Sequence, residues 1–174
     1  MWFKYPLIVL ILFFATIFQF SLLPYFSIAG YTPNLLFIIF FLVIFFENKG
    51  KYETIIFMAF VCSIFLDMTT TSYFGISFII LLLIFGLEKA FSYLSKSGQE
   101  KISIYYFIAI FSLFFILYHL IGYFVSLFFK FDTGFSFSYI ILIGLFFNMI
   151  FVGIGFYLYK LVIYKKDTNQ LKLL

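Results

Sequence analysis

Residues able to perform acid–base or metal chemistry are few in this chain. Its 174 residues contain seven Asp and Glu, one His and one Cys, and most of the carboxylates fall in loops between apolar runs. His119 with Asp67 or Ser112 is the only set from which a hydrolytic site could be assembled, and such a site also needs an oxyanion donor. The sequence has no metal-ligand spacing, Gly-rich phosphate loop or nucleophile elbow. We therefore expect no catalytic residues, no metal and no cofactor.

Asp67 is the most informative polar residue, because it ends an apolar run of nearly membrane length. Ala59, Ser63 and Asp67 are spaced four residues apart, so they share one helix face. Small residues on that face let another helix approach closely, and a carboxylate at a membrane edge should face protein rather than lipid. The hydroxyls of Thr69–Thr71 and Ser72, or backbone N–H groups, could donate to it. We expect Asp67 to tie the following connection to neighbouring helices, with partner or ligand contact as the alternative.

Three further polar residues lie inside apolar runs. Gln19, His119 and Asn148 are expected to make interhelical hydrogen bonds, each worth about 0.6 to 2 kcal/mol; for His119 a proton relay is the alternative. Glu88 and Lys89 are expected to form a solvated pair at the membrane interface. The single Cys62 excludes an internal disulfide.

The composition is that of an integral membrane protein. Hydrophobic residues make up 66% and charged residues 10% of the chain, with a mean hydropathy of +1.19. A soluble fold of this size could not bury that much apolar surface. The net charge of +4 comes from lysines at the edges of apolar runs, which indicates membrane lipid rather than nucleic acid as the partner.

The apolar runs predict an all-α bundle of six transmembrane helices in one domain, residues 1–164, followed by a polar cytoplasmic tail, 165–174. Pro33 suits the first turn of the second helix, with Thr32 as its cap and Asn34 satisfying another backbone group. Gly75 opens the fourth helix at a tight turn. The expected helices cover about Tyr5–Leu23, Pro33–Phe46, Tyr52–Leu66, Gly75–Tyr93, Ile102–Phe128 and Phe137–Tyr164.

The first segment has a second interpretation. Ser27-Ile-Ala29 is a passable cleavage site, so the segment could be a secretory signal. It is longer than a usual signal core and only Lys4 precedes it among charged residues. We therefore expect a membrane anchor and first helix.

The lysines indicate how the chain crosses the membrane. With six helices, ten lysines fall on the side of the two termini, whereas the opposite side has Lys130 alone. The positive-inside rule then places both termini in the cytoplasm and Asp67 near the outer face. The ten are Lys4, Lys49, Lys51, Lys89, Lys96, Lys101, Lys160, Lys165, Lys166 and Lys172.

The segment from Pro33 to Gly75 resembles the rod shape-determining protein MreD family. The resemblance rests on Pro33-Asn34, a charged hairpin at Glu47–Glu53, the small residues Ala59 and Ser63 before Asp67, and Gly75 eight residues after it. Family members often carry glycines where this chain has Ala59 and Ser63, which affects only how tightly helices pack. Length and hydropathy extend the likeness over the whole chain.

This resemblance implies a non-enzymatic inner-membrane subunit of the lateral cell-wall elongation machinery, involved in cell shape and peptidoglycan synthesis. Such a protein would pair with MreC and, through it, with MreB filaments and the RodA–penicillin-binding protein synthase. Its fold would be similar to the six-helix substrate-binding subunits of energy-coupling-factor transporters.

Two other function classes remain. A substrate-binding subunit of an energy-coupling-factor vitamin transporter would share this fold, but it should show an Ala-x3-Ala-like stripe in its first helix. That helix offers only Ala15 and Thr16 among Ile, Leu and Phe. A small lipid-handling enzyme or flippase is the third class, but the chain has few polar residues from which such a site could be built.

Overall fold

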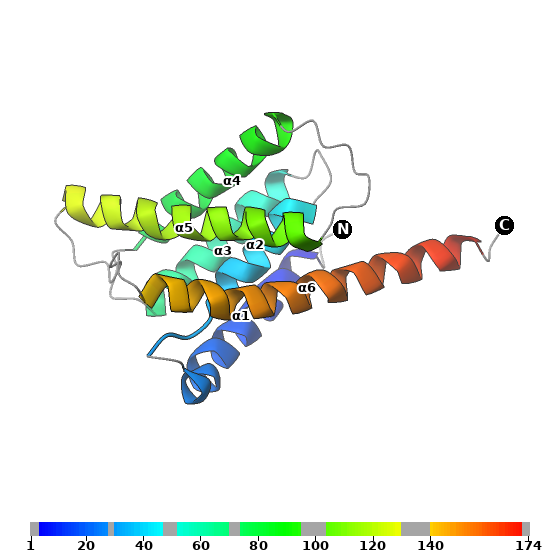
Figure 1. Ribbon diagram of the computed structural model, residues 1–174, viewed down its shortest axis with the longest axis horizontal. Coiled ribbons are helices and arrows are strands. Elements are labelled where there is room, and N and C mark those ends of the chain that lie inside the picture. The colour runs from blue at the N-terminus through cyan, green and yellow to red at the C-terminus, as the bar shows by residue number, and fades with distance from the viewer. Residues whose placement is uncertain are drawn as a thin grey trace.

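The expected all-α bundle of six helices is confirmed for the part of the chain that the structure describes. A computed structural model describes residues 4–27, 30–46, 52–69, 74–94, 104–129 and 140–171. Six α-helices and a short 3₁₀ helix, η1, form its regular structure (Figure 1). They are α1 (Lys4–Ser21), η1 (Leu23–Phe26), α2 (Leu35–Phe46), α3 (Tyr52–Thr69), α4 (Ile76–Leu94), α5 (Ile104–Phe129) and α6 (Ile140–Leu171).

Within the described residues, four helices are long and apolar enough to cross a membrane: α1, α4, α5 and α6. The chain thus has the features of a multi-pass membrane protein. The helix α2 is apolar throughout but has only 12 residues, which at about 1.5 Å per residue is about 18 Å long and shorter than a bilayer core of about 30 Å.

Three expected helix boundaries are wrong. The helix α2 begins at Leu35, and its cap is Asn34 rather than Thr32, because the Asn34 side chain accepts the Phe37 N–H. The helix α3 continues past Leu66 and contains Asp67. The helix α6 continues beyond Tyr164 to Leu171, where a frayed tail was expected, because no Pro or Gly interrupts this stretch.

Several expected features lie outside the described residues. They are the hairpin residues 47–51, the hydroxyl run 70–72, the loop 95–101, the loop residues Lys130 and Asp132, and the last two residues of the cleavage site, 28 and 29.

The short helix α2 occupies the centre of the bundle. Its sequence, LLFIIFFLVIFF, is apolar on every side, as expected of a helix surrounded by protein. It packs against α1, α3, α4 and α6, and six of its residues are buried, including Phe37, Phe41 and Ile44. The other helices are therefore arranged around α2.

Phenylalanines fill the space between α2 and α5. Phe37, Phe41 and Phe45 recur every four residues on α2 and face aromatic residues of α5 spaced in the same way. The ring centroids of Phe41 and Phe111 are 5.2 Å apart, and those of Phe45 and Phe107 are 4.8 Å apart. Such edge-to-face aromatic pairs each add about 0.5–1.5 kcal/mol beyond area burial. The phenylalanine-rich composition thus serves core packing here.

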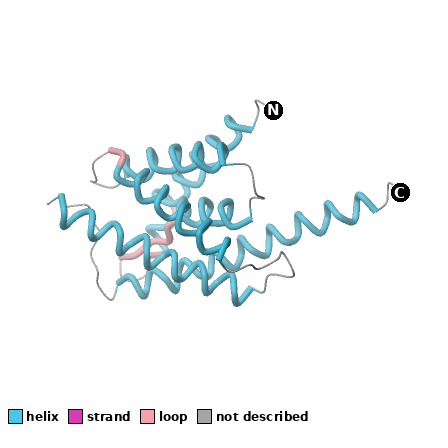
Figure 2. The backbone as a smooth tube through the Cα atoms, turned by 90° about the horizontal axis from the view of Figure 1, so that it is seen from above, coloured by secondary structure: helices cyan, strands magenta, loops and turns pink. Residues whose placement is uncertain are grey.

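The two termini lie toward the same end of the molecule (Figure 1). The C-terminal part of α6 extends past the ends of the other helices on that side, as a second view shows (Figure 2). An even number of antiparallel helices produces this arrangement.

Candidate functional site

Asp67 closes the connection between α3 and α4. Its Oδ2 accepts the backbone N–H of Gly75 at 2.6 Å, and its Oδ1 accepts that of Ser77 at 3.2 Å. Both groups belong to the start of α4, where helix N–H groups have no intrahelical acceptor and the helix dipole favours a negative charge. The side chain is 5% exposed. The expected structural tie is present, and its described donors are backbone N–H groups.

Gly75 allows this closure through its backbone conformation. Its φ is +98°, a region that residues with a Cβ rarely adopt. The carbonyl of Gly75 accepts the Ile79 N–H, so Gly75 is the cap residue of α4. Gly75 follows Asp67 by eight residues. This length of chain is enough to leave the end of α3 and begin α4 beside it.

The small-residue face of α3 is turned into the protein. Ala59, Ser63 and Asp67 are 0%, 3% and 5% exposed, respectively. The Ser63 hydroxyl donates to the carbonyl of Phe60 within its own helix, so it needs no partner from outside. This face packs internally and presents no surface to a separate subunit.

Carboxamides from two other helices converge on the N-terminus of α2. The backbone N–H of Asn34 donates to Asn148 Oδ1 of α6 at 2.9 Å. The N–H of Leu36 donates to Gln19 Oε1 of α1 at 3.3 Å, and that of Phe37 to Asn34 Oδ1 at 3.0 Å. These bonds supply acceptors to N–H groups of the first turn, which would be costly to leave unpaired in lipid. The interhelical hydrogen bonds expected of Gln19 and Asn148 are therefore present.

Tyr31 extends this cluster on the α6 side. Asn148 Nδ2 donates to the Gly144 carbonyl at 2.7 Å and to the Tyr31 hydroxyl at 3.3 Å. The Tyr31 ring lies against Gly144 so closely that a Cβ there would come within 2.4 Å of it. Burial raises the pKa of the Tyr31 phenol to about 12, and the bond to Asn148 partly offsets this. This role of Tyr31 could not be predicted, because Tyr31 stands outside every apolar run.

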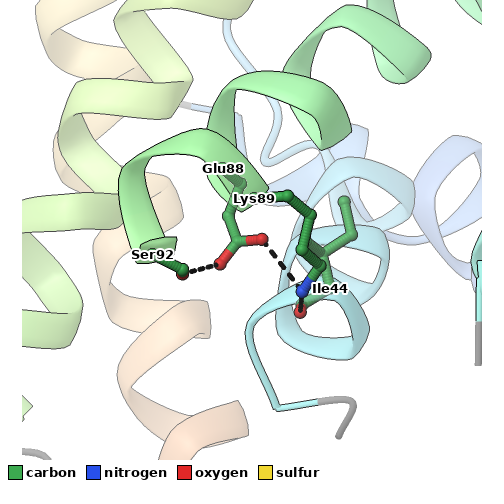
Figure 3. A network of polar contacts seen from close by, with 4 residues as sticks. All are labelled: Ile44, Glu88, Lys89 and Ser92. Carbon is green, nitrogen blue, oxygen red and sulfur yellow. Dashed lines mark hydrogen bonds and ion pairs between the residues drawn. The ribbon is translucent and has the colours of Figure 1, made fainter. Parts of the chain in front are cut away.

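A second polar network lies at the opposite end of α2 (Figure 3). Glu88 Oε2 pairs with Lys89 Nζ at 3.1 Å, and Ser92 Oγ donates to Glu88 Oε1 at 2.7 Å. Lys89 Nζ also donates to the Ile44 carbonyl at 3.1 Å, in the last turn of α2. The expectation of a solvated pair is wrong: the Glu88 side chain is only 3% exposed, and that of Lys89 is 30% exposed.

Glu88 is buried because α2 and α4 end side by side. The last carbonyls of a helix need donors and favour a cation, and Lys89 supplies both to α2 while it neutralises Glu88. The spacing of Glu88 and Ser92, four residues apart on one helix, could have indicated their hydrogen bond. The contact with Ile44 had no such indication.

Two hydrogen bonds fix which helix ends lie together. Lys4 Nζ donates to Thr54 Oγ1 at 2.9 Å, joining the starts of α1 and α3. The Tyr159 hydroxyl donates to the Phe46 carbonyl at 3.4 Å, joining the last turn of α2 to α6. Of the lysines whose side chains the structure describes, Lys4, Lys89 and Lys160 lie at this end, which we call the lysine end. The end containing Asp67, Asn34 and Asn148 is called the amide end.

His119 is the remaining polar candidate, and it lies on α5. His119, half-buried on α5, packs against Phe115 and Tyr118 of its own helix, with centroids 4.7 and 5.4 Å apart; its interhelical bond stays a prediction. Within the described ranges, no three His, Cys, Asp or Glu side chains come together as a metal site requires.

The glycines of α6 differ in their surroundings. Gly155 abuts Leu42 of α2, so that a Cβ there would come within 2.6 Å of it, whereas Gly153 has no atom within 4 Å of the corresponding position. Gly144 and Gly155 therefore allow close packing inside the chain, and Gly153 does not.

No family model, no curated protein and no solved structure matches this chain.

Proposed function

We propose that this chain is a non-enzymatic scaffold subunit of the cell-wall elongation complex in the bacterial inner membrane, of the MreD type. It crosses the membrane six times, with both termini in the cytoplasm. It pairs with MreC and acts through MreC on MreB filaments and the RodA–penicillin-binding protein synthase. In this role it takes part in cell shape and lateral peptidoglycan synthesis.

The observation that carries the proposal is the closure of Asp67 onto Gly75 and Ser77. The resemblance to MreD rests on a pattern that includes Asn34, Asp67 and Gly75, and these residues cap the starts of α2 and α4. The pattern is therefore a physical unit, in which each residue has a role that its chemical type explains. If the pattern matched MreD only by chance, these residues would not be expected to cap helices together.

A scaffold needs a rigid body and free helix faces, and the structure is compatible with both. The polar side chains Gln19, Asp67 and Asn148 are buried and hydrogen-bonded internally. By contrast, only 11% of α1 is buried, compared with 28–33% of the other three candidate spans. The helix α1 therefore leaves the most surface for lipid or for a partner helix.

The proposed orientation has the lysine end in the cytoplasm. Lys4, Lys89 and Lys160 lie at one end of the bundle, and the capped starts of α2 and α4 lie at the other. An excess of lysine marks the cytoplasmic side of a membrane protein. The short α2 packs against α1, α3, α4 and α6, which cover part of its surface.

Detergent pull-down of the tagged full chain tests the proposal. Recovery of MreC with the wall synthase is expected. An Asp67→Ala variant should recover less of them, whereas Glu53→Ala, at an exposed position on the same helix, should recover them as the original chain does. Recovery of a transporter ATPase module instead would favour the vitamin-transporter alternative, and recovery of neither would refute the scaffold role.

A further inference from the structure

The helix α6 indicates how deep each of its residues lies in the membrane. Its residues Ile140–Tyr159 are uncharged, and Lys160 is its first charged residue. At about 1.5 Å per residue this stretch is about 30 Å long, which equals the thickness of a typical hydrocarbon core. Lys160 then marks one membrane surface and Ile140 the other. By the same measure Asn148 lies about 12 Å below the surface at Ile140, which is close to the midplane.

The helix α2 begins at the depth of Asn148 rather than at the membrane surface. The backbone N–H of Asn34, the residue before α2, donates to Asn148 Oδ1 at 2.9 Å. The opposite end of α2 is level with the charged end of the α6 span, because the Tyr159 hydroxyl donates to the Phe46 carbonyl. The helix α2 therefore covers only the half of the membrane next to the lysine end.

The helix α5 leads to the same depth for the start of α2. Tyr118 of α5 lies against Phe37 in the first turn of α2, with ring centroids 4.7 Å apart. From Tyr118, α5 continues to Phe129, a further length of about 16 Å. Figure 1 shows that α5 extends farthest at this end of the molecule. Two neighbouring helices thus continue well beyond the point at which α2 begins.

Residues 30–34, which we call the strap, connect the amide end of the bundle with the start of α2. The strap contains no helix. Five extended residues reach about 16–18 Å at most, which is enough to cross the remaining distance of about 12 Å. No charged residue occurs between Lys4 and Glu47, so neither the strap nor its flanks contain a group that must stay in water. Non-helical backbone at membrane depth must be buried in protein or line a water-filled cavity.

The contacts of the strap favour burial in protein. Pro33 is buried and has no N–H group that would need a partner, and the N–H of Asn34 is bonded to Asn148. The Tyr31 hydroxyl accepts a hydrogen bond from Asn148 Nδ2 at 3.3 Å. The Tyr31 ring occupies the space that a side chain at position 144 would fill, because that residue is Gly144. The strap is therefore attached to α6 on the side of the polar cluster.

We propose that the second membrane crossing is discontinuous, with the strap as its outer half and α2 as its inner half, and that Tyr31 latches the strap against α6. The latched strap keeps water at the amide end away from the carboxamides at the start of α2. The conformation of Gly30, with a φ of +78°, turns the backbone into the strap. The inference rests on the chain crossing the membrane and does not depend on the wall-elongation role.

Labelling of an introduced cysteine in the strap tests whether water reaches it. A membrane-impermeant maleimide is applied to permeabilised spheroplasts, so that both faces are open to it and the orientation does not matter. Thr32→Cys should react at least about tenfold more slowly than Tyr25→Cys, which is exposed at the same end, because its labelling requires local opening of the strap. Equal rates would show that water reaches the strap and would overturn the proposal.

A second pair of variants tests the latch. In the Thr32→Cys background, Gly144→Ala places a Cβ against the Tyr31 ring and should raise the labelling rate severalfold. Gly153→Ala is the matched control on the same helix, because its Cβ meets no atom, and it should leave the rate unchanged. An unchanged rate in Gly144→Ala, or the same increase in both variants, would refute the latch.

Spin labels measure the depth separately, so the discontinuous crossing can be tested even if Gly144→Ala does not fold. Ile150 and Tyr157 are both exposed on α6, and Ile150 lies halfway between Ile140 and Lys160. In lipid vesicles, a nitroxide at Ile150→Cys should collide with oxygen much more often than with a water-soluble nickel chelate. A nitroxide at Tyr157→Cys, close to Lys160, should show more nickel collisions. The same collision ratio at both positions would place Asn148 away from the midplane and contradict the discontinuous crossing.

Discussion

The carboxylate of Asp67 accepts the backbone N–H of Gly75 at 2.6 Å, which is a short, charge-assisted hydrogen bond. With the bond to Ser77, it attaches the last turn of α3 to the first turn of α4. The two helices thus form an antiparallel pair, and among the described residues the Asp67 side chain joins them at this end. We therefore expect folding to depend on Asp67.

Replacing Asp67 should therefore destabilise the protein strongly. Asp67→Ala removes both acceptors and leaves two helix N–H groups without a partner in a buried place, at a cost of about 2–4 kcal/mol. Asp67→Asn keeps one acceptor oxygen but loses the charge, and should cost about half as much. The thermal unfolding midpoint in detergent measures both. Glu53→Ala, on the exposed first turn of the same helix, should cost less than about 1 kcal/mol. Equal midpoints for all three variants would contradict the role of Asp67.

Gly75 should resist substitution although there is room for a side chain. No atom lies within 4 Å of the position of an added Cβ, but the φ of +98° is unfavourable for alanine. Gly75→Ala should cost about 1–2 kcal/mol. Gly86→Ala is the matched control, because it also meets no atom but lies inside α4. That change should stabilise the protein by about 0.5–1 kcal/mol. A stabilising Gly75→Ala would show that the turn is not held in this conformation.

Sequence reasoning identified the bundle, the small-residue face and Asp67, since each depends on local spacing or on the cost of a charge in lipid. It placed Asn34 correctly as a backbone partner but assigned the cap to Thr32. Either residue type can cap a helix, and only the contact with Phe37 decides between them. The central position of α2 was not predicted. Its uniform apolarity indicated burial, although a helix facing lipid would carry the same residues.

The misassignment of Glu88 and Lys89 has a different cause. Adjacent charges near the end of a span are usually solvated, and the sequence carries no information on which helix ends meet. The burial of Glu88 follows from the placement of the α2 C-terminus beside α4. Interactions between residues 45 positions apart, such as Ile44 with Lys89, arise only in the folded chain. The same holds for Tyr31 and Gly144.

Asn148 should be the most important of the amides at the start of α2, because it binds Asn34, Gly144 and Tyr31 together. Asn148→Leu should cost about 1–2 kcal/mol, near the upper limit for interhelical hydrogen bonds in membranes. Ser112→Ala serves as the control: the Ser112 hydroxyl donates to a carbonyl of its own helix, so its loss should cost less than about 0.5 kcal/mol. Unfolding midpoints measured side by side give the comparison, and an equal loss for both variants would exclude a special role for Asn148.

The Glu88–Lys89 pair should show strong non-additivity. Lys89→Met leaves a buried carboxylate without its cation and removes a donor from Ile44, and uncompensated buried charges cost about 3–5 kcal/mol. The residual exposure of Lys89 places the expected loss toward the lower limit. Adding Glu88→Gln to Lys89→Met should recover part of the stability, because no charge is then left alone. A double-mutant cycle of unfolding midpoints measures this coupling. Additive effects would indicate that water reaches Glu88.

The proposed orientation is open to a direct test with introduced cysteines. The only native cysteine, Cys62, is buried, so labelling reports on added thiols. Tyr25 and Tyr93 are 85% and 84% exposed and lie at opposite ends of the bundle, which makes Tyr25→Cys and Tyr93→Cys a matched pair. A membrane-impermeant maleimide should label Tyr25→Cys in intact spheroplasts and Tyr93→Cys only after permeabilisation. The reason is that lysine-rich segments stay in the cytoplasm. Labelling of Tyr93→Cys from outside would place the lysine end on the outer face, and the proposed topology would then be wrong.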